Sequence, residues 1–237
     1  MILQYSILVF LSVFISGALV FAIPISKQNL KFILAFSGAY LLSICFMHIL
    51  PDLYHSSFNH ATIGLLILAG FMIQIVLEFF SSGIEHGHVH HHEKNTLLIL
   101  TISLCIHSLL EGMPLSNTQA GLKNALLWGI ILHNIPVGIA FASMLRHTLQ
   151  KKSSIFLYLG MFAIAAPLGI LMGSFVHEDK KALYNIIALS ITVGIFLHIA
   201  TTIIFEASNN HKFNFKKLIA VLIGLTVGIL FHTTHIH

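Results

Sequence analysis

Long apolar segments follow one another along almost the whole chain, and short polar connections separate them. A helix needs about 20 mainly apolar residues to cross the hydrocarbon core of a bilayer. Strands of a membrane barrel would be about half as long and would alternate apolar with polar residues, so the pattern predicts helices. Eight suitable segments occur, at residues 5–23, 31–50, 62–80, 96–115, 122–145, 155–175, 184–205 and 215–233. We therefore predict an all-α polytopic membrane protein with eight transmembrane helices, in one domain over residues 1–237.

The composition excludes several other classes of protein. Of 237 residues, 57% are hydrophobic and only 8% are charged, whereas a soluble domain carries roughly a quarter charged residues. The formal net charge of +4 comes from 12 Lys and Arg against 8 Asp and Glu, with no basic stripe. The composition therefore predicts a multi-pass protein of the cell membrane, surrounded by the lipid bilayer, and no binding of nucleic acid.

The distribution of cations predicts the orientation, because cytoplasmic loops of membrane proteins are enriched in Lys and Arg. With the N-terminus outside, only three cations fall on the outer connections, Lys123, Lys180 and Lys181. Nine fall on the inner connections: Lys27, Lys31, Lys94, Arg146, Lys151, Lys152, Lys212, Lys216 and Lys217. Both termini are therefore expected to be extracytoplasmic, and the first span is expected to be a retained helix rather than a signal peptide.

Histidine is unusually frequent, with 17 residues in the chain, and it is the commonest metal ligand among side chains. The connection at residues 84–95, predicted to be cytoplasmic, is rich in this residue: it contains His86, His88, His90, His91 and His92. Such a tract suits transient coordination of Zn²⁺ or a similar ion. The alternative is a weakly selected linker.

Polar side chains also lie inside the fourth and fifth spans, where an ionisable group is costly and is a functional candidate by default. In the fourth span, His107 and Glu111 are four residues apart and share one helix face. In the fifth, Pro136 lacks an N–H and leaves nearby backbone carbonyls without helical partners. The side chains that together match the N/O ligands of Zn²⁺ are His107, Ser108, Glu111, His133 and Asn134. For each residue singly, a hydrogen bond between helices is the alternative.

Two further pairs of His and carboxylate lie toward the ends of spans. His48 and Asp52 are four residues apart at the outer end of the second span, and His198 and Glu206 lie on one face of the seventh, toward the cytoplasm. We interpret them as polar sites along an ion pathway, on either side of the His and Glu side chains of the fourth and fifth spans. Helix capping and anchoring at the membrane interface explain Asp52 and Glu206 equally well. Glu78, near the inner end of the third span, is interpreted as an interfacial residue.

These motifs resemble, in order along the whole chain, those of the ZIP (Zrt/Irt-like) divalent metal transporters. His-Ser-Leu-Leu-Glu-Gly (107–112) resembles the family's His-Asn-x-x-Glu-Gly, and His-Asn-Ile-Pro-Val-Gly (133–138) resembles its His/Gln-x-x-Pro-Glu-Gly. Further matches are His-Ile-Leu-Pro-Asp (48–52), Ala-Pro-Leu-Gly (166–169) and Gly-Ile-Phe-Leu-His-Ile-Ala (194–200). The resemblance implies a 3+2+3 bundle with inverted repeats. It also implies movement of Zn²⁺, or of Fe²⁺, Mn²⁺ or Cd²⁺, into the cytoplasm.

The resemblance also assigns ligands between the fourth and fifth helices, where the family often binds two ions. By position, the first metal site would use His107, Glu111 and His133, and the second would use Ser108, Glu111 and Asn134. This chain departs from the family at Val137, where a metal-binding Glu is usual, and at Ser108, where Asn is usual. Loss of that carboxylate favours a single-metal site.

The expected function is therefore transport of divalent cations, with zinc as the first candidate and the ion as substrate rather than as a catalytic cofactor. No enzyme activity is expected, and a homodimer is considered as an assembly. One alternative is a membrane b-type cytochrome with His107 and His133 as axial haem ligands, although a Glu one turn from an axial His would be unusual. The other is an intramembrane zinc enzyme, which would need a His-Glu-x-x-His string that the chain lacks.

Overall fold

The computed structural model describes residues 2–81, 83–84, 94–206 and 215–233, and these are helical almost throughout. The described part contains no strand, so the predicted all-α class is confirmed. The elements are α1 (Ile2–Leu19), α2 (Lys27–Ile44), η1 (Cys45–Ile49), α3 (Leu50–His55), α4 (His60–Ser81), α5 (Lys94–Gly112), η3 (Met113–Ser116), α6 (Ala120–Thr148), α7 (Lys152–Ser174), η4 (Glu178–Lys180), α8 (Lys181–Glu206) and α9 (Phe215–Thr233). The five loop histidines, His86 to His92, lie outside the described residues.

The long helices correspond to the spans expected from the sequence. Within the described residues, seven helical segments are long and apolar enough to cross a membrane. One of them, Lys27–His55, joins α2, η1 and α3 into a single span. The eighth predicted span forms α9, a helix of 19 residues. The chain is thus a polytopic membrane protein.

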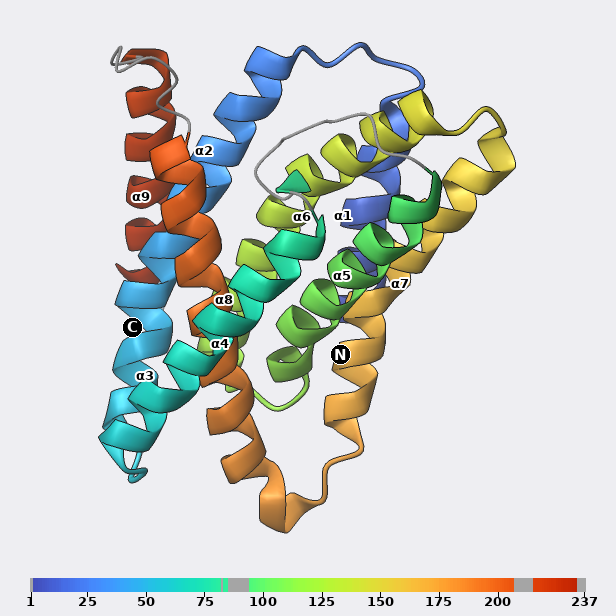
Figure 1. The fold of residues 1–237 in the computed structure, drawn as a ribbon. Coiled ribbons are helices and arrows are strands. Elements are labelled where there is room, and N and C mark those ends of the chain that lie inside the picture. The colour runs from blue at the N-terminus through green and yellow to red at the C-terminus, as the bar shows by residue number, and fades with distance from the viewer. Residues whose placement is uncertain (1, 82, 85–93, 207–214, 234–237) are drawn as a thin grey trace.

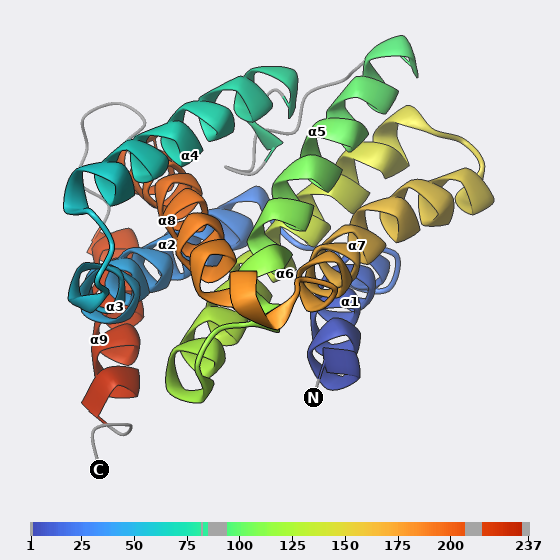
Figure 2. The same cartoon turned by 90° about the horizontal axis from the view of Figure 1, so that it is seen from below.

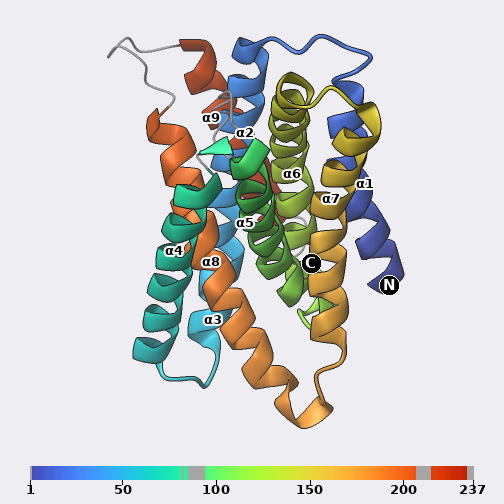
Figure 3. The same cartoon turned by 45° about the vertical axis from the view of Figure 1, so that its right-hand side comes forward.

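The helices run alternately up and down, side by side in one bundle (Figures 1 and 3). The α1–α2 and α6–α7 connections lie at one end of the bundle, and the α3–α4 and α7–α8 connections lie at the other. Seen along the bundle, α5 and α6 occupy the middle, with α2, α4, α8 and α9 on one side and α1 and α7 on the other (Figure 2). The central position of α6 agrees with its burial, since 83% of its apolar stretch is buried inside the bundle.

The packing partners follow a two-fold pattern. Helix α1 packs on α6 as α7 packs on α5, and α2 packs on α9 as α8 packs on α4. The pairs α1 and α7, and α2 and α8, contact each other directly. If α1, α2 and α4 are exchanged with α7, α8 and α9, and α5 is exchanged with α6, these same pairs of helices are in contact. This is the pattern that an inverted repeat around two central helices produces.

Glycines bring several of these helices into very close contact, as small residues do in membranes. On α4, a Cβ added at Gly70 would lie 2.1 Å from the carbonyl oxygen of Ile191 on α8. On α8, a Cβ at Gly194 would lie 2.0 Å from the carbonyl oxygen of Ile67 on α4. A side chain at either position would collide with backbone, so α4 and α8 form an interlocked pair.

Candidate metal centre

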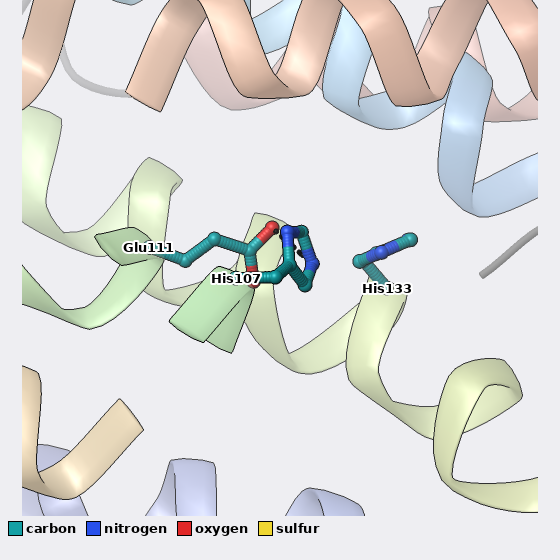
Figure 4. Close-up of side chains that lie close together, drawn as sticks. All are labelled: His107, Glu111 and His133. Atoms are coloured by element: carbon teal, nitrogen blue, oxygen red, sulfur yellow. Dashed lines mark ion pairs between the residues drawn. The ribbon is translucent and has the colours of Figure 1, made fainter. Parts of the chain in front are cut away.

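Two histidines and a glutamate converge between the central helices (Figure 4). His107 and Glu111 come from α5 and His133 from α6, and one ligand atom of each lies within 4.8 Å of the others. The Nε2 of His107 is 3.2 Å from Oε1 of Glu111. The two imidazole rings stand edge to face, with centroids 6.0 Å apart and an interplanar angle of 81°. Among the described residues, this is the one such group of three or more His, Cys, Asp or Glu side chains.

The three side chains are closed off from the surface of the bundle. His107 is 1% exposed, and Glu111 and His133 are 0% exposed. Burial of a carboxylate is expensive unless a cation or hydrogen-bond donors face it. Two imidazole nitrogens and a carboxylate oxygen at this spacing form a ligand set of the kind that Zn²⁺ accepts. The arrangement is chemically suited to hold a divalent cation in the middle of the bundle.

Local sequence explains how the two helices present these groups. The four-residue spacing puts His107 and Glu111 on one face of α5. The structure shows α6 as a single helix that continues through Pro136. Because proline has no N–H, the carbonyl of Leu132 receives no helical hydrogen bond from residue 136. A backbone oxygen thus lacks its helical partner directly beside His133.

The two other predicted ligands, Ser108 and Asn134, are also buried, at 0% and 1% exposure. Within the described part of the chain, their side-chain nitrogen and oxygen atoms form no hydrogen bond. Buried polar groups are normally hydrogen-bonded, so these atoms remain available to an ion or to water. Val137 is fully buried in the apolar core, one turn after His133.

A buried glutamine from a third helix contacts the central group, and sequence reasoning missed it. The Oε1 of Gln74 on α4 lies 3.0 Å from Nδ1 of His107, and Gln74 is 0% exposed. Glutamine is not ionisable, so it did not stand out among the polar residues. The available signal was its spacing: Gln74 lies four residues before Glu78, so α4 carries a polar pair on one face.

The structure gives His198 a different neighbour from the one that the sequence indicated. Its Nδ1 lies 3.3 Å from Oε2 of Glu78 on α4, and its ring packs edge-on against Phe71 with centroids 4.9 Å apart. The sequence indicates an interfacial residue at Glu78, and the structure shows that its carboxylate also pairs with a side chain of the neighbouring helix. Glu206 is the last residue of α8, and its side chain lies outside the described part.

The second-span motif begins in a π-helical turn, η1, which contains His48. Pro51 has no N–H for an α-helical bond to residue 47, and the preceding N–H, of Leu50, bonds the carbonyl of Cys45 five residues back. His48 is half-buried and Asp52 is exposed. The wider turn thus includes the first residue of the motif, and such turns often mark functional sites.

Comparison with known proteins finds several zinc transporters among the relatives of this chain. Zinc transporter ZIP9 of Micropogonias undulatus is 28% identical over 60% of this chain and 50% of its own length. Zinc transporter ZIP1 of Danio rerio is 22% identical over 85% of this chain and 84% of its own. Zinc transporter ZIP1 of Plasmodium falciparum is 28% identical over 63% and 50%. The chain thus spans about half the length of the ZIP9 relatives that it matches.

A family model described as ZIP Zinc transporter matches residues 85–232, well over half of the chain. The matched range contains all of the convergent His and Glu side chains on α5 and α6. The chain therefore belongs to the ZIP zinc transporter family.

Proposed function

We propose that this chain moves divalent metal cations, zinc first among them, across the cell membrane into the cytoplasm. The observation that carries the proposal is the buried convergence of His107, Glu111 and His133 between the two central helices. The relatives support it, since those matched here are named zinc transporters. Uptake of radioactive zinc into liposomes that carry the purified chain tests the proposal, with protein-free liposomes as the blank.

The ligand set indicates how the substrate ion would be held. Two neutral imidazoles and the Glu111 carboxylate would supply three ligands, and the oxygens of Ser108 and Asn134 would complete the shell. One carboxylate offsets only half of the charge of a dication, which favours a single ion over a pair. An ion whose charge is only partly neutralised is bound less tightly. Weaker binding favours transport, because the ion must also leave the site.

The pathway on either side of the centre is part of the proposal. We propose that ions approach past His48 and Asp52 and leave past His198 and Glu206, with Glu78 as an additional carboxylate on the leaving side. The pairing of Glu78 with His198 supports this, because it adds an acidic oxygen at 3.3 Å to an imidazole that sequence reasoning had already selected.

Orientation and assembly complete the proposal. Cations gather at the end of the bundle where α1 and α8 terminate: Arg146 donates to the carbonyl of Val20, and Lys217 to that of Ile204. By the positive-inside rule this end faces the cytoplasm, so both termini are extracytoplasmic and the His-rich connection at residues 84–95 is cytoplasmic. A homodimer remains a prediction.

The geometry disfavours the haem alternative. Haem iron bound by two histidines requires the flat macrocycle to lie between their rings. Here Oε1 of Glu111 lies 3.2 Å from Nε2 of His107, in the space that the macrocycle would need. An intramembrane zinc enzyme is disfavoured by the family match and by the lack of a His-Glu-x-x-His string.

Val137→Glu is expected to lower the half-saturating zinc concentration while leaving the maximal rate equal or reduced. Position 137 is buried one turn from His133, so a carboxylate there would add a second anionic ligand. Attraction to a dication in a partly dehydrated site is much stronger than in water, and tighter holding slows release. Initial uptake rates measured against zinc, iron and manganese check this result.

Val137→Gln is the matched control, because it has nearly the same shape as the glutamate variant but carries no charge. It should shift the half-saturating concentration much less than Val137→Glu. If the glutamate variant folds normally and neither affinity nor metal preference changes, position 137 does not face the ion.

Replacement of His86, His88, His90, His91 and His92 by asparagine is expected to preserve uptake. The segment lies in a connection, outside the spans that carry the central ligands, and would act as an acceptor or sensor at the cytoplasmic mouth. The expected change is in rate or in regulation by metal, measured by uptake at matched protein levels. Complete loss of uptake would show that the essential ligands lie in this connection.

A further inference from the structure

We propose that Gln74 is a positioning residue, which fixes the tautomer of His107 and so makes the Nε2 of that histidine available to the metal ion. The inference rests on the proposed function and deepens it, because it assigns a role at the same centre to a third helix, α4. It concerns a residue that neither its charge nor the sequence motifs point to.

The contact itself determines which nitrogen of His107 carries a proton. The Oε1 of Gln74 lies 3.0 Å from Nδ1 of His107. An amide oxygen accepts hydrogen bonds and cannot donate them, so Nδ1 must be the donor. In neutral imidazole only one nitrogen carries hydrogen, and Nε2 therefore keeps its lone pair.

That lone pair lies where a metal ion would need it. The Nε2 of His107 is 3.2 Å from Oε1 of Glu111, and His107, Glu111 and His133 each bring a ligand atom within 4.8 Å of the others. Histidines that bind metals nearly always donate their second N–H to an oxygen acceptor, which fixes both tautomer and ring orientation. Gln74 supplies that acceptor here.

Burial protects the contact between Gln74 and His107 from competition by water. Gln74 is 0% and His107 is 1% exposed, so bulk water is kept away from the contact and cannot readily replace the amide as partner of Nδ1. Without an acceptor, the proton would move to Nε2, where it can be donated to Glu111. A metal ion would then have to displace that proton and leave a buried N–H without a partner, which is unfavourable.

Helix α4 is held in the position that this contact requires. One turn before Gln74, the backbone of Gly70 lies against the carbonyl of Ile191 on α8. Three residues after it, the carbonyl of Leu77 accepts a hydrogen bond of 2.5 Å from Oγ of Ser103 on α5. Gln74 thus sits between two fixed contacts, one to α8 and one to the helix that carries His107.

The test compares zinc affinities of the purified full-length protein in detergent, by competition with a chromogenic zinc chelator. Gln74→Leu should weaken zinc binding by about 10–100-fold, as loss of such outer partners typically does. Gln74→Glu should bind nearly as tightly as wild type, because a carboxylate also accepts from Nδ1. Ser81→Ala is the matched control, since Ser81 is buried in the same helix and its Oγ donates to the backbone carbonyl of Glu78.

Two further measurements separate positioning from a general effect on the fold. In the His107→Ala background, Gln74→Leu should cause no additional loss, because the residue acts through His107. Nitrogen NMR of labelled histidine, assigned through the His107→Ala variant, should show protonated Nδ1 in wild type and in Gln74→Glu. In Gln74→Leu the protonated nitrogen should be Nε2.

Several results would overturn the inference. Wild-type affinity in Gln74→Leu would do so, as would an additive loss in the His107→Ala background. Loss in Gln74→Glu as large as in Gln74→Leu would show that the amide donates to Nδ1 instead. If Glu111→Ala also keeps wild-type affinity, the proposed metal centre itself fails; if only the Gln74 variants keep it, the inference alone fails.

Discussion

Glu111→Ala is expected to reduce metal uptake to background while the protein remains in the membrane. Glu111 is the only fully buried acidic side chain among the described residues, and it faces His107 at 3.2 Å. It is therefore the main negative charge available to a dication in the middle of the bundle. In a medium of low dielectric constant, removal of that charge takes away several kcal/mol of attraction. Neutral ligands alone would not offset the loss of the ion's hydration shell.

The measurement is uptake of radioactive zinc, with cadmium and manganese in parallel, at matched amounts of protein in proteoliposomes. Glu178→Ala is the control, because Glu178 is an acidic residue of η4 whose exposed side chain pairs with Lys181 at the start of α8. It should transport as wild type does. Near wild-type uptake by Glu111→Ala would place the essential charge elsewhere in the chain.

Gly169→Ala is the second substitution with a large expected effect, although it adds a single methyl group. A Cβ at Gly169 on α7 would lie 2.1 Å from the carbonyl oxygen of Leu109 and 3.2 Å from the backbone nitrogen of Met113. Both atoms belong to the stretch that carries Glu111. Backbone cannot rotate away as a side chain can, so α5 and α7 must separate. A displacement of about 1 Å costs on the order of 100-fold where groups must meet in a fixed geometry.

Uptake and thermal unfolding of the detergent-purified variant measure this effect, and both should fall. Gly160→Ala is the matched control on the same helix, since nothing lies within 4 Å of a Cβ at Gly160. Alanine has the higher helix propensity, so this control should be at least as stable as wild type. Equal stability and equal uptake for the two variants would mean that α5 and α7 do not pack as closely as described.

Much of this architecture could be predicted from the sequence, because the properties that determine it are local. A run of about 20 apolar residues crosses a bilayer as a helix whatever its neighbours are, and each predicted span corresponds to a helix. The helical period likewise places His107 and Glu111 on one face without reference to any other helix. The same local reasoning located a buried histidine in the fifth span, His133.

Local spacing was less informative where the helix is irregular. For His48 and Asp52 the four-residue rule assumes a regular helix, but the π-turn of η1 lies at this place. This turn was not predicted from the sequence; the signal for it is Pro51, whose missing N–H disturbs the helix one turn earlier. Spacing also grouped His198 with residues of its own helix and could not show that Glu78 of α4 lies 3.3 Å away.

Contacts between helices were decided only by the tertiary structure. In a membrane, apolar helices gain little from apolar contact with each other rather than with lipid, so small residues and polar groups select the partners. Gly70 and Gly194 allow the close approach of α4 to α8, and Gln74 on α4 contacts His107 on α5. The sequence by itself determined which segments span the membrane and which residues on one helix share a face. The tertiary structure decided which faces meet, because that depends on backbone approach between segments far apart in the chain.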